Sequence, residues 1–184
     1  MLSWTLLGTR AAVCVCGVAL AAQGSGVWLD VPFIKQEKNG CGAATIAMVM
    51  QYWQKQPGGT PDAGSDPADI QRALYSSEGR GIYASDMERY FQNHHFRTYT
   101  FRGQWDDLKQ HLEKGRPLIV AVKPLRGETA LHYLVVAGVD LERNLVIVND
   151  AAQRKLLKVD RASFVKEWNE VDDWTLLALP ESPK

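Results

Sequence analysis

The chain has 184 residues, which is enough for one domain with a hydrophobic core and too few for two large domains. Hydrophobic residues make up 46% of it and charged residues 23%, as in ordinary globular proteins. The formal net charge is +0, so no excess of basic residues indicates binding to nucleic acid or to an anionic membrane.

The first 21 residues have the pattern of a secretory signal peptide. Met1 to Arg10 carries one positive charge and no acid, an apolar run follows over 11–20, and Ala19-Leu20-Ala21 forms an A-x-A cleavage site. The run is shorter than the roughly 20 apolar residues that a transmembrane helix needs. We therefore expect an exported protein, periplasmic or secreted, whose mature domain covers 22–184 without a stable membrane span. An uncleaved N-terminal anchor is the alternative.

Cleavage of this signal would leave a single cysteine. Cys14 and Cys16 lie within the signal, and Cys41 alone remains in the mature domain. It cannot form an internal disulfide, and a free thiol in an exported protein is exposed to oxidation. A buried, inert cysteine is one explanation, but the neighbours of Cys41 favour a functional one.

The N-terminal half is predicted to be mainly helical. An extended segment over 27–34 leads to a polar turn, and the following run GAATIAMVMQYW (42–53) is apolar on nearly all sides, as in a buried helix. Beyond a loop over 56–67, the predicted elements are a helix from Asp66-Pro67 to Tyr75, a helix to His94 with Ser85 as N-cap, a short strand over 97–101 and an amphipathic helix over 104–114.

The C-terminal half changes to β-branched and apolar runs separated by turn residues. Strands are predicted at 118–122, 133–139, 145–148, 155–159 and 174–179, with a short helix over 161–168. Helices followed by a mostly antiparallel sheet are typical of the α+β class. The sequence contains no His, Cys, Asp or Glu set at a zinc or calcium spacing, and no phosphate-binding glycine motif, so neither a metal nor another cofactor is expected.

Cys41 stands between two glycines, directly before the predicted buried helix. A helix N-terminus has free N–H groups and the positive end of the helix dipole, and both favour a thiolate over a thiol. Gln36 lies upstream at a distance from which its amide could donate, together with the Cys41 N–H, to an oxyanion. A solvated loop glutamine is the alternative.

His132 and Asp150 are expected to meet on one face of the sheet. A tight connection centred near Glu142 would set Leu134 opposite Asp150, with His132 one diagonal step away, at about 7–8 Å between Cα atoms. An aspartate that accepts from one imidazole nitrogen leaves the other nitrogen to take the thiol proton. A slip of one residue would separate the two side chains, leaving a core histidine and a turn aspartate.

Together these motifs resemble the C39 peptidase family, and more closely its stand-alone C39-like branch. The matching stretches are VPFIKQ (31–36), NGCGAA (39–44), HYLVVAG (132–138) and VND (148–150), within a similarity that covers about residues 28–180. The resemblance implies a papain-like fold, with the nucleophile at the N-terminus of a buried helix packed on the sheet. It also implies a triad of Cys41, His132 and Asp150, with Gln36 as the oxyanion donor. Ala151 departs from the proline that often follows the aspartate in the family.

The expected function is therefore hydrolysis of peptide bonds in a peptide or protein substrate outside the cytoplasm. Two alternatives stay open, namely a transglutaminase-like acyl transferase that uses the same triad and a non-catalytic peptide-binding module. The sequence indicates no nucleic-acid partner and no particular oligomeric state.

Overall fold

The computed structural model describes residues 26–59, 63–124 and 131–181, and the predicted signal peptide lies outside them. The helices in these residues are α1 (Cys41–Gln54), α2 (Pro67–Leu74), α3 (Ala84–Asn93), α4 (Trp105–Glu113) and α5 (Arg161–Asn169), with a 3₁₀ turn η1 (Ala63–Ser65). The strands are β1 (Gly26–Trp28), β2 (Phe96–Arg102), β3 (Leu118–Val122), β4 (His132–Asp140), β5 (Leu145–Asn149), β6 (Leu157–Asp160) and β7 (Trp174–Pro180). This arrangement confirms the predicted α+β class.

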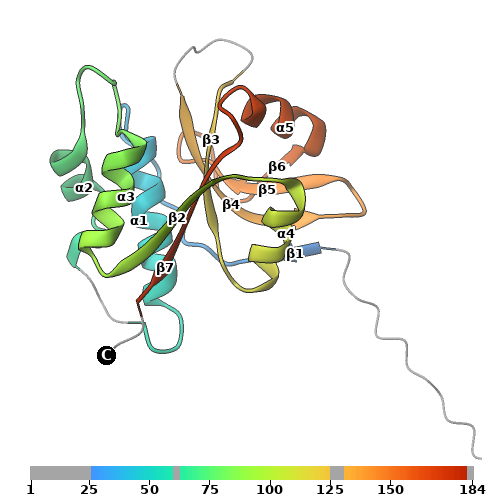
Figure 1. Ribbon diagram of the computed structural model, residues 1–184, viewed down its shortest axis with the longest axis horizontal. Coiled ribbons are helices and arrows are strands. Elements are labelled where there is room, and N and C mark those ends of the chain that lie inside the picture. The colour runs from blue at the N-terminus through green and yellow to red at the C-terminus, as the bar shows by residue number, and fades with distance from the viewer. Residues whose placement is uncertain (1–25, 60–62, 125–130, 182–184) are drawn as a thin grey trace, which may run out of the picture.

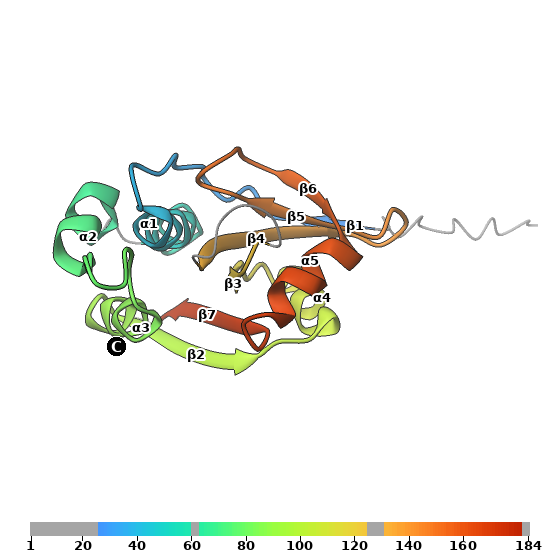
Figure 2. The same cartoon turned by 90° about the horizontal axis from the view of Figure 1, so that it is seen from above.

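All strand pairs are antiparallel and belong to one sheet. The order is β2-β7-β3-β4-β5-β6, and β1 pairs with the C-terminal end of β4. Figure 1 shows α1, α2 and α3 grouped beside the sheet, and Figure 2 shows α4 and α5 at its other side. The sheet therefore separates two helical layers.

Side chains of the central strands alternate between these two layers, because successive residues of a strand point to opposite faces. On β3, Ile119 and Ala121 pack in the cluster that contains α1, whereas Val120 packs with Leu108 of α4 and Phe164 of α5. With both faces buried, the central strands need apolar residues at nearly every position, which accounts for their uninterrupted apolar runs.

Two predicted helix starts had different outcomes. α2 begins at Pro67, as predicted, and Asp66 is its N-cap, whose carboxylate accepts from backbone N–H groups of the first turn. For α3 the predicted N-cap was wrong. The helix begins one residue before Ser85, with Tyr83 as N-cap, because the Tyr83 carbonyl already accepts from the N–H of Met87 at 3.0 Å.

A β-bulge in β4 changes its register against β5. Near the turn Asp140 pairs with Leu145, whereas beyond the bulge Val135 pairs with Asn149, and Ala137 is the extra residue between the two stretches. The turn is thus one residue longer than the predicted pairing requires, and the bulge absorbs the difference.

This bulge decides which face of the sheet carries Asp150. One step beyond the last pair, Leu134 lies opposite Asp150, so Asp150 shares a face with Leu134 and with His132. Had the pairing at the turn continued without the bulge, Val135 would lie opposite Asp150 and the aspartate would point away from His132.

The bulge is also where β1 docks. The Leu29 N–H donates to the carbonyl of Ala137 at 2.7 Å. The neighbouring residue must be glycine, because a Cβ on Gly138 would come within 2.7 Å of both the Trp28 Cβ and the Val27 carbonyl oxygen. The N-terminal segment and the bulge therefore hold each other in place.

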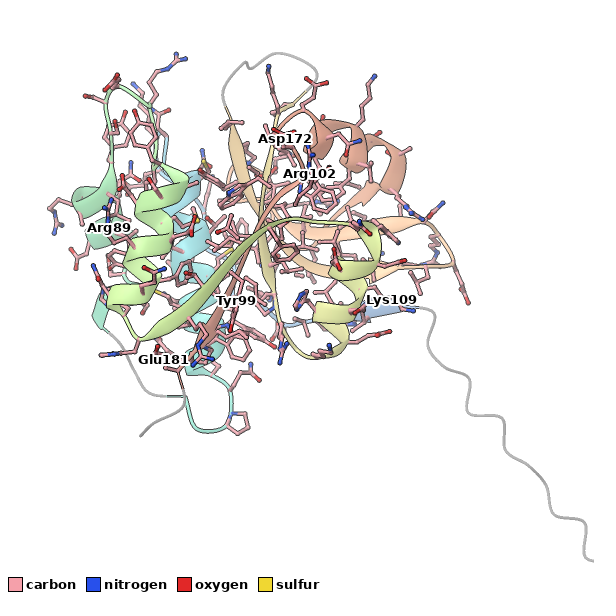
Figure 3. The ribbon with its side chains drawn as sticks, in the orientation of Figure 1. Arg89, Tyr99, Arg102, Lys109, Asp172 and Glu181 are labelled. Atoms are coloured by element: carbon pink, nitrogen blue, oxygen red, sulfur yellow. The ribbon has the colours of Figure 1, made fainter. Side chains whose placement is uncertain are left out.

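The surface carries charges of both signs, in agreement with the net charge of +0. Figure 3 shows Arg102 and Asp172 side by side, where they form an ion pair that joins the end of β2 to the turn before β7. Lys109 and Glu113 form a second pair along α4 at 3.7 Å. Across 26–59, 63–124 and 131–181, no helix has the length and apolar character needed to cross a bilayer.

Candidate active site

Cys41 is the first residue of α1, and no side chain caps or neutralises the positive N-terminal end of this helix. Gly40 is the N-cap and offers no side-chain hydrogen bond, and the first turn contains no acidic residue. The positive end of the helix dipole and the free N–H groups of the first turn therefore act on the Cys41 sulfur. Asn39, with φ of +57°, turns the chain into the helix from the left-handed region.

The two glycines beside Cys41 allow tight packing of this turn. A Cβ on Gly42 would lie 2.9 Å from the Cβ of Ile82, and a Cβ on Gly40 would lie 3.1 Å from the Glu37 carbonyl oxygen. The absence of side chains at both positions lets α1 begin against the segment that precedes α3 and against its own upstream turn.

The structure brings together Cys41, His132 and Asp150. His132 Nε2 lies 2.8 Å from Asp150 Oδ1, and the Cys41 side chain is hydrogen-bonded to His132. Because Nε2 faces the aspartate, Nδ1 is the ring nitrogen left for the sulfur. The His132 side chain is 18% exposed and that of Asp150 is 5% exposed, so the histidine reaches solvent at the rim while the acid lies below it.

Every oxygen of the Asp150 carboxylate has a hydrogen-bond donor. Oδ1 accepts from His132 and from the Ala152 N–H at 2.9 Å, and Oδ2 accepts from Gln153 Nε2 at 2.5 Å. Burial would raise the pKa of Asp150, but His132 and the two further donors outweigh it and hold this pKa below its ordinary value. Gln153 was not among the predicted site residues.

The same contacts favour a thiolate–imidazolium pair. Burial of the sulfur would raise the pKa of Cys41, but the hydrogen bond and charge of His132, with the N–H groups of Tyr133 and Gly42, lower it below its ordinary value. Burial would lower the pKa of His132, but hydrogen bonds to Asp150 and Cys41 raise it to about 10. At neutral pH the proton therefore belongs on the imidazole.

Gln36 lies in the segment that leads to Cys41 and is tied to the loop after β5. The Gln36 N–H donates to the Ala151 carbonyl at 3.0 Å, which ties the segment before Cys41 to the loop that carries Asp150. The Gln36 Oε1 atom is buried and has no hydrogen-bond partner in the described part of the chain. Its role as an oxyanion donor stays a prediction.

The model of the Peptidase_C39-like family matches residues 28–174, which is most of the chain. The protein belongs to this family. No curated protein sequence matches the chain.

Three solved structures have the same fold. They are a candidate C39-like peptidase from Bacillus anthracis (TM-score 0.62, 16% identity, 86% of this chain and 99% of that one covered) and the peptidase domain of Streptococcus ComA, a bifunctional ABC transporter of a quorum-sensing pathway (0.64, 20%, 82% and 99%). The third is a double-glycine-motif protease of an AMS/PCAT transporter, in complex with its leader peptide (0.63, 21%, 84% and 94%). At these identities the likeness establishes the fold alone, and the papain-like arrangement predicted from the sequence is consistent with it.

In this C39-like chain a buried asparagine holds the segment that leads to Gln36. Asn149 Nδ2 donates to the carbonyls of Val31 (3.2 Å) and Pro32 (3.4 Å), and its Oδ1 accepts from the Leu156 N–H at 2.9 Å. The side chain is fully buried, so no water can replace these partners without rearrangement. Asn149 is therefore a structural link between β5 and the segment before the nucleophile.

We expect Asn149→Ala to lower the free energy of unfolding by about 2–4 kcal/mol, because one buried and two part-buried backbone groups lose their partner. Urea denaturation followed by fluorescence measures the change. The matched control is Asn93→Ala at the exposed end of α3, which should change stability by less than about 0.5 kcal/mol. Equal stability of the two variants would contradict the assigned role of Asn149.

A separate cavity of about 510 Å³ lies at the far end of β4, next to the β4–β5 turn. Its walls include Trp105, Arg161 and Trp168, with the Arg161 guanidinium 4.5 Å above the Trp105 ring, and no residue of the triad. In the residues that the structure describes, no group of three His, Cys, Asp or Glu side chains is placed to hold a metal ion.

Proposed function

We propose that the protein is a cysteine peptidase that hydrolyses peptide bonds, with Cys41 as nucleophile, His132 as general base and acid, and Asp150 orienting the histidine. The observation that carries this proposal is the continuous set of hydrogen bonds from Cys41 through His132 to Asp150 at an uncapped, buried helix N-terminus. Membership of the C39-like family supports the same chemistry.

The reaction follows from the positions of these groups. The Cys41 thiolate attacks the carbonyl carbon, and the oxyanion that forms is stabilised by the Cys41 N–H and by the Gln36 amide. His132 gives its proton to the leaving amine, and a thioester remains on Cys41. His132 then removes a proton from water, which attacks the thioester, and the acid product leaves with the thiolate and imidazolium restored.

A peptide is the proposed substrate, and the space outside the cytoplasm is the proposed place of action. The double-glycine-motif protease with the same fold binds a leader peptide, which supports a peptide ligand for this chain as well. Export rests on the signal-like pattern of residues 1–21.

The test is a peptide mixture incubated with the purified protein in water enriched in oxygen-18, with the products analysed by mass spectrometry. Hydrolysis places one oxygen-18 atom in each new carboxyl group, and Cys41→Ala should produce no such product. With an added primary amine, an acyl transferase would instead form amide products that carry no label. Cleavage by the Cys41→Ala variant, or binding without cleavage by the unaltered protein, would contradict the peptidase proposal.

A further inference from the structure

Tyr133 follows the histidine of the proposed triad on β4, and its side chain lies on the α1 face of the sheet. There it packs in the hydrophobic cluster against which Cys41 also lies. Its backbone N–H is one of the groups that lower the pKa of the Cys41 thiol. The Tyr133 side chain and the nucleophile therefore lie at the same end of β4, beside the place where a substrate would bind.

A tryptophan holds the Tyr133 ring in place. Tyr133 pairs with Ala121 of β3, and Trp174 follows one step beyond the last β3–β7 pair, so the three residues form a row across the sheet. The Tyr133 and Trp174 rings meet edge to face, with centroids 5.6 Å apart and 61° between their planes. A tyrosine side chain has only two χ angles, so this contact and the burial of Tyr133 fix the position of its hydroxyl oxygen.

The Tyr133 hydroxyl has no hydrogen-bond partner within residues 26–59, 63–124 and 131–181, although the residue is only 6% exposed. Tyr52 is buried to the same extent, and its hydroxyl donates to the Gly115 carbonyl at 2.9 Å. Buried tyrosine hydroxyls ordinarily find such a partner. The unpaired hydroxyl of Tyr133, next to the nucleophile, therefore indicates a partner that arrives with the substrate.

The Tyr133 hydroxyl keeps its proton under the conditions of the reaction. Burial and the nearby charge of Cys41 raise the pKa of Tyr133 to about 12. At neutral pH the hydroxyl is therefore a hydrogen-bond donor, and the group that it binds is an acceptor. Every peptide presents such acceptors, its backbone carbonyl oxygens, on both sides of the bond that is cut.

We propose that the Tyr133 hydroxyl donates a hydrogen bond to a backbone carbonyl of the substrate close to the scissile bond. Tyr133 is then a substrate-binding residue in addition to the triad, and Trp174 supports it by holding its ring. The inference rests on the proposed peptidase function and deepens it, because it assigns a contact to the main chain of the peptide at the start of β4.

Peptide reagents that alkylate Cys41 test this contact without any need for cleavage. Alanine peptides ending in a chloromethyl ketone cover one side of the scissile bond, and alanine peptides with an N-terminal chloroacetyl group cover the other. In each series an E-alkene replaces one amide at a time beyond the reactive group, which removes one carbonyl oxygen and keeps the shape. In the unaltered protein one such analogue should react about tenfold more slowly than its parent, the effect of one hydrogen bond.

The substitution Tyr133→Phe removes only the hydroxyl. The parent reagent should react about tenfold more slowly with this variant, and the alkene should cause no further loss. Tyr99→Phe on β2, where the tyrosine is 44% exposed, is the matched control and should behave as the unaltered protein. Iodoacetamide, which carries no peptide, should alkylate Cys41 equally fast in all three proteins.

A second variant, Tyr133→Met, also lacks the hydroxyl and repeats the test if Tyr133→Phe loses stability. Equal rates for every analogue and its parent in the unaltered protein, or discrimination that survives in both Tyr133 variants, would overturn the proposed contact. So would slower alkylation by iodoacetamide in both variants, because the hydroxyl would then act on the thiolate itself. Discrimination that depends on Tyr133, together with no hydrolysis of any peptide, would overturn the peptidase function and leave the contact standing.

Discussion

Replacing His132 with alanine is expected to slow the alkylation of Cys41 by iodoacetamide at pH 6 by up to roughly 300-fold, because an ordinary cysteine with a pKa near 8.5 is about 0.3% thiolate there. In the unaltered protein His132 lowers the pKa of Cys41, so the sulfur is ionised at lower pH. In the unaltered protein the rate of Cys41 alkylation should therefore reach its plateau well below pH 8. In the variant it should reach the plateau only at a pH above the ordinary pKa of a cysteine. Stopped alkylation samples analysed by mass spectrometry across pH 5 to 9 measure both curves.

The matched control is His111→Ala on α4, since His111 is partly buried and lies outside the triad. This control should leave the pH profile of Cys41 unchanged. Coincident profiles for all three proteins would make Cys41 an ordinary thiol. Peptide hydrolysis should in addition fall as the pH rises through the raised pKa of His132, about 10, because the imidazolium that protonates the leaving amine is lost.

Gln36→Leu is expected to lower kcat for peptide hydrolysis by about 10²–10³-fold, the usual effect of removing one oxyanion donor. The same variant should keep the pH profile of Cys41 alkylation, because displacement of iodide by sulfur forms no oxyanion. Single-turnover cleavage of a peptide found in the oxygen-18 experiment gives the first quantity, and the iodoacetamide assay gives the second.

Gln110→Leu, at an exposed site on α4, serves as the control for the glutamine-to-leucine change, and Gln36→Glu tests whether a side chain of the same shape without N–H donors fails in the same way. A loss of kcat no larger than that of the control would remove Gln36 from the mechanism. A parallel loss of alkylation would mean that the substitution disturbs the turn that holds Cys41.

Much of the fold follows from local pattern. The apolar run after Cys41 has no polar face, so its burial as α1 could be predicted. The start of α2 could be predicted because the Asp66 carboxylate can accept from first-turn N–H groups and the ring of Pro67 fits the first helical position. The meeting of His132 and Asp150 was predicted from strand pairing with a period of two. The predicted turn was one residue too short, and the prediction holds because the bulge at Ala137, which was not predicted, compensates for the difference. These signals lie within a few residues of the structure that they specify.

The remaining parts of the site arise from contacts between distant segments, which leave no periodic signal. The Asn149 side chain contacts residues more than a hundred positions earlier in the chain. The Tyr133 N–H near the sulfur is a backbone group that any residue would supply. Gln153 looks like an ordinary polar surface residue in the sequence, and only the packing of the loop after β5 gives it the Asp150 carboxylate as a partner.

Because of the bulge at Ala137, Cys41 becomes reactive only after the chain has folded. The nucleophile is translated before residue 50, but Asp150 faces the correct side of the sheet only after β4 and β5 have paired with the extra residue in place. Leu29 stabilises that bulge only when the N-terminal segment has docked. Until both steps are complete, the Cys41 thiol has its ordinary pKa. The unfolded chain is therefore an inactive form of the protein. A protein that crosses a membrane before folding would have no activated nucleophile during the crossing.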